Sequence, residues 1–301
     1  MLENKNNQDQ TATANDMSAS DICNVIAEAA MMQDIDEIAR ATKMLMKDLG
    51  DALLASDALW YLKSGFTDLP YISETMTTLI FDDEYYAQKY ADTHSTLKLL
   101  PQRVERNNYK RMFAEIYDCG IGSVAYCNNS KSVALPIDVY FLTVSTQKNA
   151  CNARELTRYI AMLMQEIRND ERQYDRKNQI VDLLKKNVIS SMTDAKVFVP
   201  INAIKDVHAE LVVDISFGTN LKVSTMRTDD NRIFFPVYTS VAEYKKNSMH
   251  GLNLVSIPLG EFIRFVRHSI DRDPSVIGVV VNSGSFNFAI NKSIMDIFLS
   301  L

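Results

Sequence analysis

The sequence predicts an α/β protein, more closely an α+β-like one, built from two duplicated mixed-sheet units that are each preceded by a pair of helices. Three observations lead to this fold. Short apolar stretches typical of strands alternate with amphipathic helical stretches along the 301 residues. Hairpin-like stretches are interleaved with the helices, which favours mixed sheets over purely parallel ones. Similar stretches recur in the same order in both halves, which indicates an internal duplication.

The overall composition fits a globular protein and excludes several classes. Apolar residues make up 47% and charged residues 23% of the chain. A net charge of −6 disfavours a general nucleic-acid binder, which carries a basic face. The polar N-terminal stretch has no secretory signal, and no apolar run is long enough for a membrane span. The four scattered cysteines are expected to be free thiols, so we expect a cytoplasmic protein with no membrane partner.

Residues 1–17 lack periodicity and are expected to be a disordered tail, whereas residues 18–150 are expected to form the first helical pair and the first unit. Ser20 and Asp34 are suitable N-caps for the two helices, and Leu49 is expected on their buried face. The further elements expected are strands at 56–64 and 77–83, a short helix at 84–90, an extended stretch at 95–101, a helix at 109–117 and a strand pair at 121–127 and 132–141.

Residues 151–301 repeat this order. Asn152 and Glu155 resemble a capping box at the start of a helix. A second, more polar helix is expected to run through Ile180, Leu183, Leu184 and Val188. The elements expected after it are strands at 193–201 and 232–240, a short helix at 242–246, a strand at 252–258, a helix at 262–270 and a closing hairpin at 276–294.

The second half also contains a polar insertion at 202–231. Its alternating stretch at 211–215 predicts an added strand, and Phe217 is followed by a glycine that suits a turn. If this insertion is exposed, it is a candidate for binding a partner through strand addition or through its loop, around Phe217 and Asn220. An extra hairpin that only extends the sheet explains the same residues equally well.

The second half resembles the SseB (enhanced serine sensitivity) N-terminal-domain family. The resemblance rests on "KVFVPI", "FFPVYTSVAEY", "IPLGEFIRFV" and "GVVVNSGSFNFAI", which contain the residues that match the family pattern: Pro200, Pro236, Thr239, Ser240, Asn282, Gly284 and Ser285. Ser283 stands where the family usually has proline. The resemblance is clearest over 194–301 and weaker over 57–142. It implies a small α/β module without catalytic residues, and some members resemble bacterial immunity or accessory proteins of secretion and toxin systems.

Motifs that suggest chemistry have simpler structural explanations. "GIGSVA" at 120–125 matches a dinucleotide fingerprint, but a helix precedes it and a strand follows, which is the reverse of the required order. His268 and Ser269 are adjacent on a helix and therefore point apart. Asp82 and Asp83 lie where a helix begins, so capping is a better explanation than metal binding. No metal ligand set and no cofactor motif is expected.

The turn at 282–285 suits a tight hairpin, in which Gly284 is expected to take a positive φ. Such loops also bind partners. The candidate partner-binding residues are Phe217, Asn220, Thr239, Ser240, Asn282, Ser283, Gly284 and Ser285. The function expected is that of a non-catalytic, cytoplasmic protein-interaction module with a protein partner. The alternatives are a small-molecule binder or enzyme with a site in the cleft between the repeats, and a homo-oligomer formed through the N-terminal helices.

Overall fold

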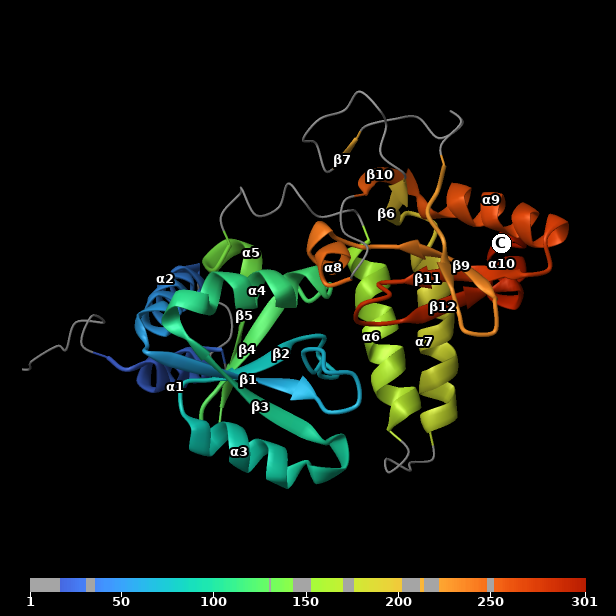
Figure 1. The fold of residues 1–301 in the computed structure, drawn as a ribbon. Coiled ribbons are helices and arrows are strands. Elements are labelled where there is room, and N and C mark those ends of the chain that lie inside the picture. Colours follow the sequence, from blue (N-terminus) through green and yellow to red (C-terminus); the bar gives the residue numbers. More distant parts are fainter. Residues whose placement is uncertain are drawn as a thin grey trace, which may run out of the picture.

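The computed structural model describes residues 17–30, 36–129, 131–142, 153–169, 176–201, 212–213, 222–247 and 252–301. It confirms the mixed α/β class (Figure 1). The expected tail at 1–17 lies almost wholly outside the described residues, as do Asp34, Asn152, Phe217 and Asn220. Among the described residues, no helix combines the length and the apolar character that crossing a membrane requires.

The first half begins with two helices and continues into a five-stranded sheet. Its elements are α1 (Ala19–Ala29), α2 (Asp36–Ala55), β1 (Ala58–Ser64), β2 (Thr78–Phe81), α3 (Glu84–Thr93), β3 (Leu99–Glu105), α4 (Tyr109–Asp118), β4 (Ser123–Cys127), β5 (Ser132–Pro136) and α5 (Ile137–Tyr140). The strand order is β3-β1-β2-β4-β5. Only β2 and β4 are parallel, and the other pairs are antiparallel.

The second half repeats this series of elements. They are α6 (Arg154–Arg168), α7 (Lys177–Ser191), β6 (Lys196–Ile201), β7 (Val212–Val213), β8 (Met226–Arg227), β9 (Ile233–Val237), α8 (Val241–Lys245), β10 (Asn253–Pro258), α9 (Leu259–Arg272), β11 (Val276–Val281), β12 (Phe288–Asn291) and α10 (Lys292–Leu299). β6 pairs with β10 and β11 pairs with β12 in antiparallel fashion, whereas β9 and β11 are parallel.

One backbone pairing shows that both halves share a topology. Phe198 of β6 and Tyr238, which follows β9, exchange two N–H···O bonds of 2.8 Å. These bonds place β6 beside β9, which gives the order β10-β6-β9-β11-β12. Strand for strand, this order and its directions match those of the first half, so the duplication inferred from the sequence is present in the fold.

The insertion modifies the second copy. β7 pairs in parallel with β10, and β8 pairs with the first part of β9. The added strand expected at 211–215 is therefore present as Val212–Val213, on the outer edge of β10. The structure thus shows that part of the insertion extends a sheet.

One main core runs through both halves. It contains residues from each helical pair and from both sheets, including Leu49, Phe113, Leu156 and Phe262. A smaller cluster under α3 covers the opposite face of the first sheet. Since α4 of the first unit also contacts α6, the second helical pair packs between the two sheets, as Figure 1 shows.

Several expected boundaries were wrong. The N-cap of α1 is Ser18 rather than Ser20, in a capping box with Asp21. The N-cap of α6 is Ala153, which makes no side-chain cap. Residues 137–140 form α5 instead of continuing a strand, and α10 follows the closing hairpin. Residues 95–97 form a 3-10 turn before β3.

Candidate functional site

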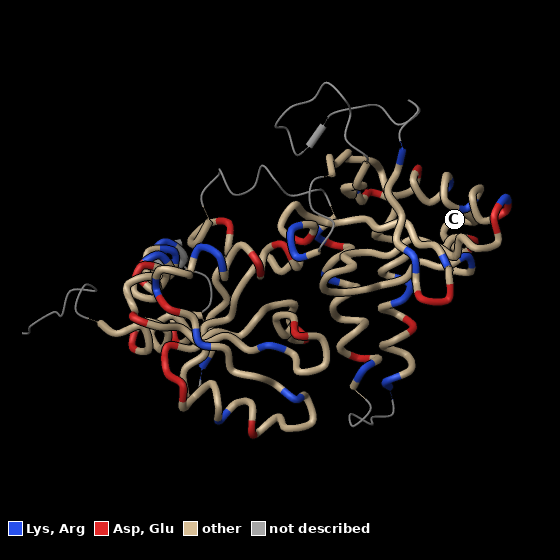
Figure 2. Tube along the Cα trace, in the orientation of Figure 1, with Lys and Arg blue, Asp and Glu red and all other residues tan. Residues whose placement is uncertain are grey.

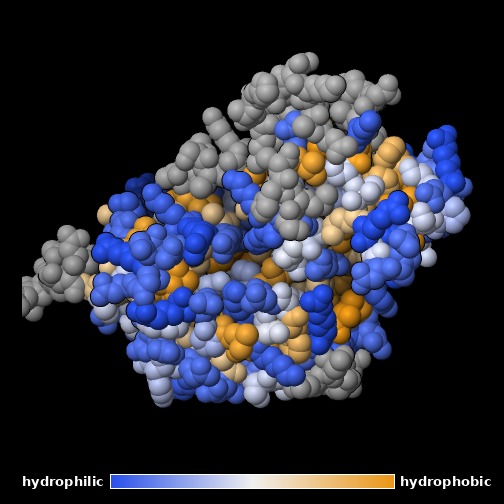
Figure 3. Space-filling model, in the orientation of Figure 1, coloured by the Kyte–Doolittle hydropathy of each residue, from blue (hydrophilic) through white to orange (hydrophobic). Residues whose placement is uncertain are grey.

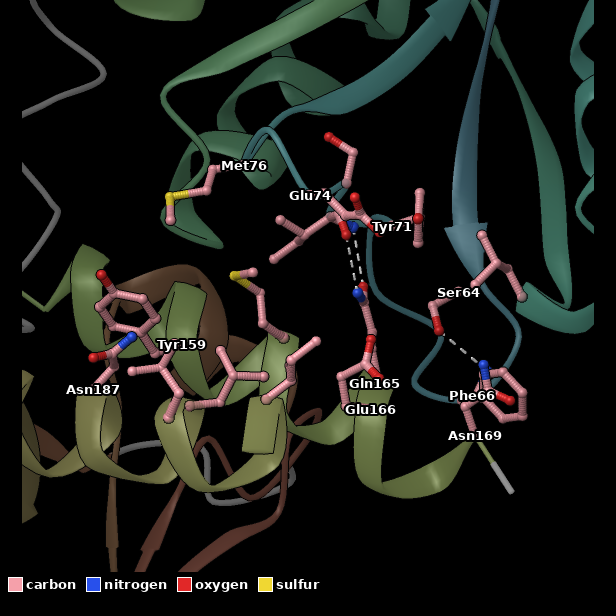
Figure 4. Close-up of a pocket in the computed structure, with 17 residues that line it drawn as sticks. Ser64, Phe66, Tyr71, Glu74, Met76, Tyr159, Gln165, Glu166, Asn169 and Asn187 are labelled. Atoms are coloured by element: carbon pink, nitrogen blue, oxygen red, sulfur yellow. Dashed lines mark hydrogen bonds between the residues drawn. The ribbon is translucent and has the colours of Figure 1, made fainter. Parts of the chain in front are cut away.

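A groove lies where the first unit meets the second helical pair, and we call it the α6–α7 groove. One side is the segment of residues 64–76, which connects β1 to β2, together with Leu97, and the other side is α6 and α7. The cavity has a volume of about 380 Å³ (Figure 4). Its lining residues are Ser64, Phe66, Tyr71, Ile72, Ser73, Glu74, Met76, Leu97, Tyr159, Met162, Gln165, Glu166, Asn169, Ile180, Leu183, Leu184 and Asn187.

The 64–76 segment is fixed to α6 by a buried side-chain amide. Gln165 Oε1 accepts a hydrogen bond from the Ile72 N–H at 3.0 Å, and Gln165 Nε2 donates one to the Ile72 carbonyl at 3.2 Å. Arg168 Nη1 also donates to the carbonyl of Phe66 at 3.2 Å. Figure 4 shows the Gln165 side chain reaching from α6 to the segment. These bonds fix the 64–76 segment against α6 on one side of the groove.

The segment is also held to its own sheet. The Tyr71 N–H donates to the Leu62 carbonyl at 2.8 Å, and Thr78 Oγ1 donates to the Tyr71 carbonyl at 3.1 Å. The Ser73 N–H donates to the Thr77 carbonyl at 2.9 Å, which closes a turn. Met76 has a φ of 59°, a region that side chains rarely adopt, and its side chain lies at the rim. The turn thus presents a large apolar side chain to the groove.

The opposite wall carries exposed apolar side chains on α7. Leu183 is 56% exposed and Ile180 is 38% exposed, and both line the cavity. The sequence predicts a helix through these two residues, Leu184 and Val188, and only the latter two are buried. Figure 3 shows apolar surface bordered by polar side chains in the region that α6 and α7 occupy in Figure 1.

Charged side chains of both signs border the groove. Glu74 and Glu166 belong to its lining. Arg168 and Lys98 contact the lining residue Phe66, and Lys177 donates to the carbonyl of Asn169. Basic and acidic residues are likewise interspersed over both units, as Figure 2 shows.

A second cavity of about 310 Å³ lies between the two units, and we call it the inter-unit cavity. The first unit supplies Tyr61, Lys63, Glu115 and Cys119, among others, and the second unit supplies Lys246, Gly284 and Ser285. Two of the residues named from the sequence, Gly284 and Ser285, thus line a cleft between the repeats.

A polar cluster adjoins this cavity. Lys246 Nζ lies 2.5 Å from Oε1 of the buried Glu243, and Ser285 donates to the other oxygen of that carboxylate. Asp118, at the end of α4, faces the same cluster. Burial, and then the Glu243 carboxylate, raise the pKa of Asp118 to about 6, although Lys246, Arg154 and a hydrogen bond with Ser240 oppose the shift. The contact between the units therefore contains a carboxyl that titrates near neutrality.

The candidate residues of the hairpin mainly hold its loop in place. Asn282 is buried, and its side chain accepts from the Thr239 N–H at 2.9 Å and donates to Thr239 Oγ1 at 2.8 Å. Ser283 Oγ lies 2.9 Å from the Tyr238 hydroxyl. Ser240 caps α8 through the Glu243 N–H at 3.1 Å, as its sequence position suggests.

The expected conformation of Gly284 was wrong. Asn282 and Asn287 have the positive φ values in this loop, both 50°, and Gly284 does not. The space around Gly284 favours glycine for a different reason, since a Cβ there would make a tight contact of 3.2 Å with the backbone of Lys246. Asparagine tolerates the left-handed region better than most residues do, which explains how the loop turns without a glycine at a positive φ.

The other motifs have structural roles. Gly120 has a φ of 83° and turns the chain from α4 into β4, so "GIGSVA" is a helix-to-strand turn. Ser269 donates to the carbonyl of Phe265 and is not paired with His268. Asp83 caps α3 by accepting from the Tyr85 N–H at 2.8 Å. Within the described residues, no three His, Cys, Asp or Glu side chains are grouped so that they could hold a metal ion.

Three cysteines are described, and all are buried. Burial raises the thiol pKa to about 11 for Cys23 and to about 12 for Cys127. Burial and then Glu243 raise that of Cys119 to about 12. Since the thiolate is the reactive form, these three thiols are inert in the folded protein near neutral pH.

The α6–α7 groove could not be found from sequence periodicity. Ile180 and Leu183 fit a helix face that is simply buried, and the partner segment at 64–76 is about 100 residues away along the chain.

Comparison with known proteins gave one match. Residues 166–292 match the model of the SseB protein N-terminal domain. No curated protein and no solved structure matches the chain. The match begins near the end of α6 and covers α7, the second sheet and the hairpin, so it confirms the resemblance inferred from the sequence. Residues 166–292, in the second half of this chain, are therefore similar to the SseB protein N-terminal domain.

Proposed function

We propose that this protein is a non-catalytic protein-interaction module of the bacterial cytoplasm, which binds a segment of a partner protein in the α6–α7 groove. The observation that carries the proposal is the exposed apolar wall of Ile180 and Leu183 beside a preformed cavity of about 380 Å³. Exposed apolar surface bordered by polar residues is typical of interaction sites. The finer proposal, an immunity or accessory factor of a secretion or toxin system, rests on the family resemblance.

The physical chemistry of the groove favours association. Covering an apolar side chain stabilises a complex by about 25 cal/mol per Å² of apolar area removed from water, before the cost of association is subtracted. The bonds from Gln165 and Arg168 fix the 64–76 segment, so little ordering cost arises on that side of the groove. Met76 and Met162 add flexible side chains that adapt to a ligand.

The proposal is tested by purification of the tagged full chain from its source cells at physiological salt. Three forms are compared by quantitative mass spectrometry: wild type, Leu183→Asp and the control Val139→Asp. Val139 is 64% exposed on α5, outside the groove. We expect a stoichiometric partner to co-purify with wild type and with the control. The amount of this partner recovered with Leu183→Asp is expected to be at least about tenfold lower. Equal partner levels in all three forms would contradict the proposed site.

A second function is favoured by the inter-unit cavity. Its walls combine Tyr61, Lys63, Glu115 and Lys246 with groups whose pKa values are shifted by burial, and such pockets commonly bind small molecules. Under this alternative, a metabolite raises the melting temperature of wild type in a concentration-dependent way, and Lys63→Met reduces the shift. A panel of polar metabolites that leaves the melting temperature unchanged would count against it.

A further inference from the structure

We infer that the inter-unit cavity and a second cavity adjoining it together bind one uncharged, hydroxyl-rich small molecule of the size of a disaccharide. This inference rests on the second function proposed above, to which it adds the class of ligand, and it is independent of the α6–α7 groove. It follows from the contact between the two cavities, from one buried hydroxyl without a partner and from the balance of charges in the walls.

The adjoining cavity lies on one face of the first sheet, between β1, β3 and α4, and we call it the sheet cavity. Its volume is about 340 Å³, and that of the inter-unit cavity is about 310 Å³. Both are lined by the same four side chains, those of Tyr61, Lys63, Met112 and Glu115. An apolar cavity of about 150 Å³ accommodates a benzene ring. Each cavity therefore has room for one six-membered ring that carries hydroxyl groups.

The side chain of Tyr61 is the shared feature that points to a ligand. Tyr61 is only 6% exposed, and it lines both cavities. Among the described residues, no group forms a hydrogen bond with its hydroxyl. Burial, and then the Glu115 carboxylate, raise the pKa of Tyr61, so this hydroxyl stays protonated. A buried hydroxyl without a partner costs free energy, and a ligand oxygen that accepts its hydrogen bond removes that cost.

The charges in the two walls favour an uncharged ligand. Every charged side chain that lines either cavity already has a partner of opposite sign. The pairs are Lys63–Asp68, Arg103–Glu105, Arg111–Glu115 and Lys246–Glu243. A charged ligand has to take one member from such a pair and leave the other uncompensated. The balance of these pairs therefore selects against net charge on the ligand.

The same walls retain hydrogen-bonding capacity for hydroxyl groups. A lysine has three N–H donors and a carboxylate has roughly four acceptor positions, so one ion pair does not saturate either group. Ser285 donates to Glu243 and keeps its oxygen as an acceptor. Gln102 donates to the Arg103 carbonyl at 3.1 Å and keeps its own carbonyl oxygen. Many weak polar contacts without net charge are the complement of a polyhydroxylated ring.

The experiment measures the binding of sugars to the full chain by isothermal titration calorimetry and by saturation-transfer NMR. The neutral probes are maltose, cellobiose, trehalose, sucrose and the single-ring glucose, and the charged counterparts of glucose are glucuronate and glucosamine. We expect at least one disaccharide to bind with a Kd below about 1 mM, at least about tenfold more tightly than glucose, because it occupies both cavities. Glucose is expected to bind at least about threefold more tightly than either charged counterpart.

Three variants locate the site. Tyr61→Phe is expected to weaken the disaccharide about 3- to 10-fold and to leave the melting temperature unchanged, because the hydroxyl has no protein partner. The matched control is Tyr109→Phe, whose hydroxyl lies 3.0 Å from Ser56 Oγ. It is expected to lower the melting temperature and leave the affinity unchanged. Arg111→Met removes the cation 3.9 Å from Glu115, so glucosamine is expected to bind this variant at least as tightly as glucose does.

The outcomes distinguish this inference from the proposed functions. If no neutral disaccharide binds at about 10 mM, or if Tyr61→Phe binds it as tightly as wild type, the inference is overturned. If glucuronate or glucosamine binds wild type more tightly than glucose, the argument from charge balance is wrong, and the inference fails with it. A charged metabolite whose binding depends on Lys63 would leave the second function standing without this ligand class. None of these results bears on a partner bound through Leu183.

Discussion

The side-chain amide of Gln165 makes one hydrogen bond with the backbone N–H of Ile72 and one with its carbonyl, across 93 residues of sequence. Both bonds are buried, so neither backbone group has water as a substitute. This pair joins the first unit to the second helical pair, and both residues line the α6–α7 groove. The groove is therefore a product of the contact between the duplicated halves.

Gln165→Leu is expected to lower the free energy of unfolding by about 2–4 kcal/mol, because two buried backbone groups lose their partners. The measurement is urea denaturation followed by circular dichroism. The matched control is Gln88→Leu, in which an exposed glutamine of α3 is replaced, and it is expected to stay within about 0.5 kcal/mol of wild type. Equal stabilities of the two variants would show that the Gln165 bonds do not hold the segment.

The orientation of α7 is tested by two adjacent leucines. Leu184→Ala is expected to cost about 2–4 kcal/mol because this side chain is buried. Leu183→Ala is expected to cost less than about 1 kcal/mol because its side chain is 56% exposed. Thermal or urea unfolding of both variants distinguishes them, and a reversed order would mean that α7 is rotated relative to the fold described above.

The raised pKa of Asp118 predicts the direction in which the stability of the protein changes with pH. Its carboxyl has a pKa of about 6 in the folded protein and the ordinary value of 3.8 in the unfolded chain. Between these values the folded state holds the proton more tightly, so this group's contribution to stability is full below pH 4 and is lost as pH rises through 6. At neutral pH we therefore expect Asp118→Asn to be more stable than wild type by about 1–3 kcal/mol.

The difference between Asp118→Asn and wild type is the informative quantity, because other carboxyls titrate in both proteins. Asp271 and Asp296, for example, have pKa values lowered by hydrogen bonds with Arg267, which makes wild-type stability fall at low pH. We expect the two proteins to be about equally stable near pH 4 and to diverge by pH 7. A difference that is constant across this range would exclude a raised pKa for Asp118.

Asn282 and Asn287 provide a matched pair in the hairpin loop, since both have a φ of 50°. Replacement by alanine removes a residue that tolerates this conformation at both positions. Only Asn282→Ala also removes two buried bonds to Thr239. We expect Asn282→Ala to be about 1–3 kcal/mol less stable than Asn287→Ala in urea unfolding. Similar losses would mean that backbone conformation, not the Thr239 contacts, makes Asn282 important.

Much of the fold follows from local patterns in the sequence. The apolar runs of β1, β6 and β11 and the helical faces of α4 and α9 are where the periodicity predicts them. Their repeated order also predicts the duplicated sheet. The prediction of a strand at 137–140 is wrong, although Ile137 and Val139 are β-branched, a type that favours strands. Tertiary contacts override this preference, and Ile137 is buried at the start of α5.

The candidate site is less accessible to sequence reasoning. The hairpin residues 282–285 suggest a binding loop. In the structure, however, Asn282 is buried and its side chain is hydrogen-bonded to Thr239. Of these four residues, only Gly284 and Ser285 line the inter-unit cavity. Whether Leu183 or Leu184 faces solvent depends on which part of the α7 surface α6 and the 64–76 segment cover. No local pattern in the sequence contains this information. Surfaces made between two distant parts of a chain are decided by packing, so the α6–α7 groove emerges only in three dimensions.

The most direct test of the α6–α7 groove as the binding site is site-specific photo-cross-linking in the source cells. A benzoylphenylalanine residue is introduced at position 183, and in a control at position 139, which is also exposed. We predict one discrete cross-linked adduct from position 183, whose attached peptide maps to a single segment of one partner, and none from position 139. No adduct from position 183, or the same adducts from both positions, would contradict the claim that the α6–α7 groove is the binding site.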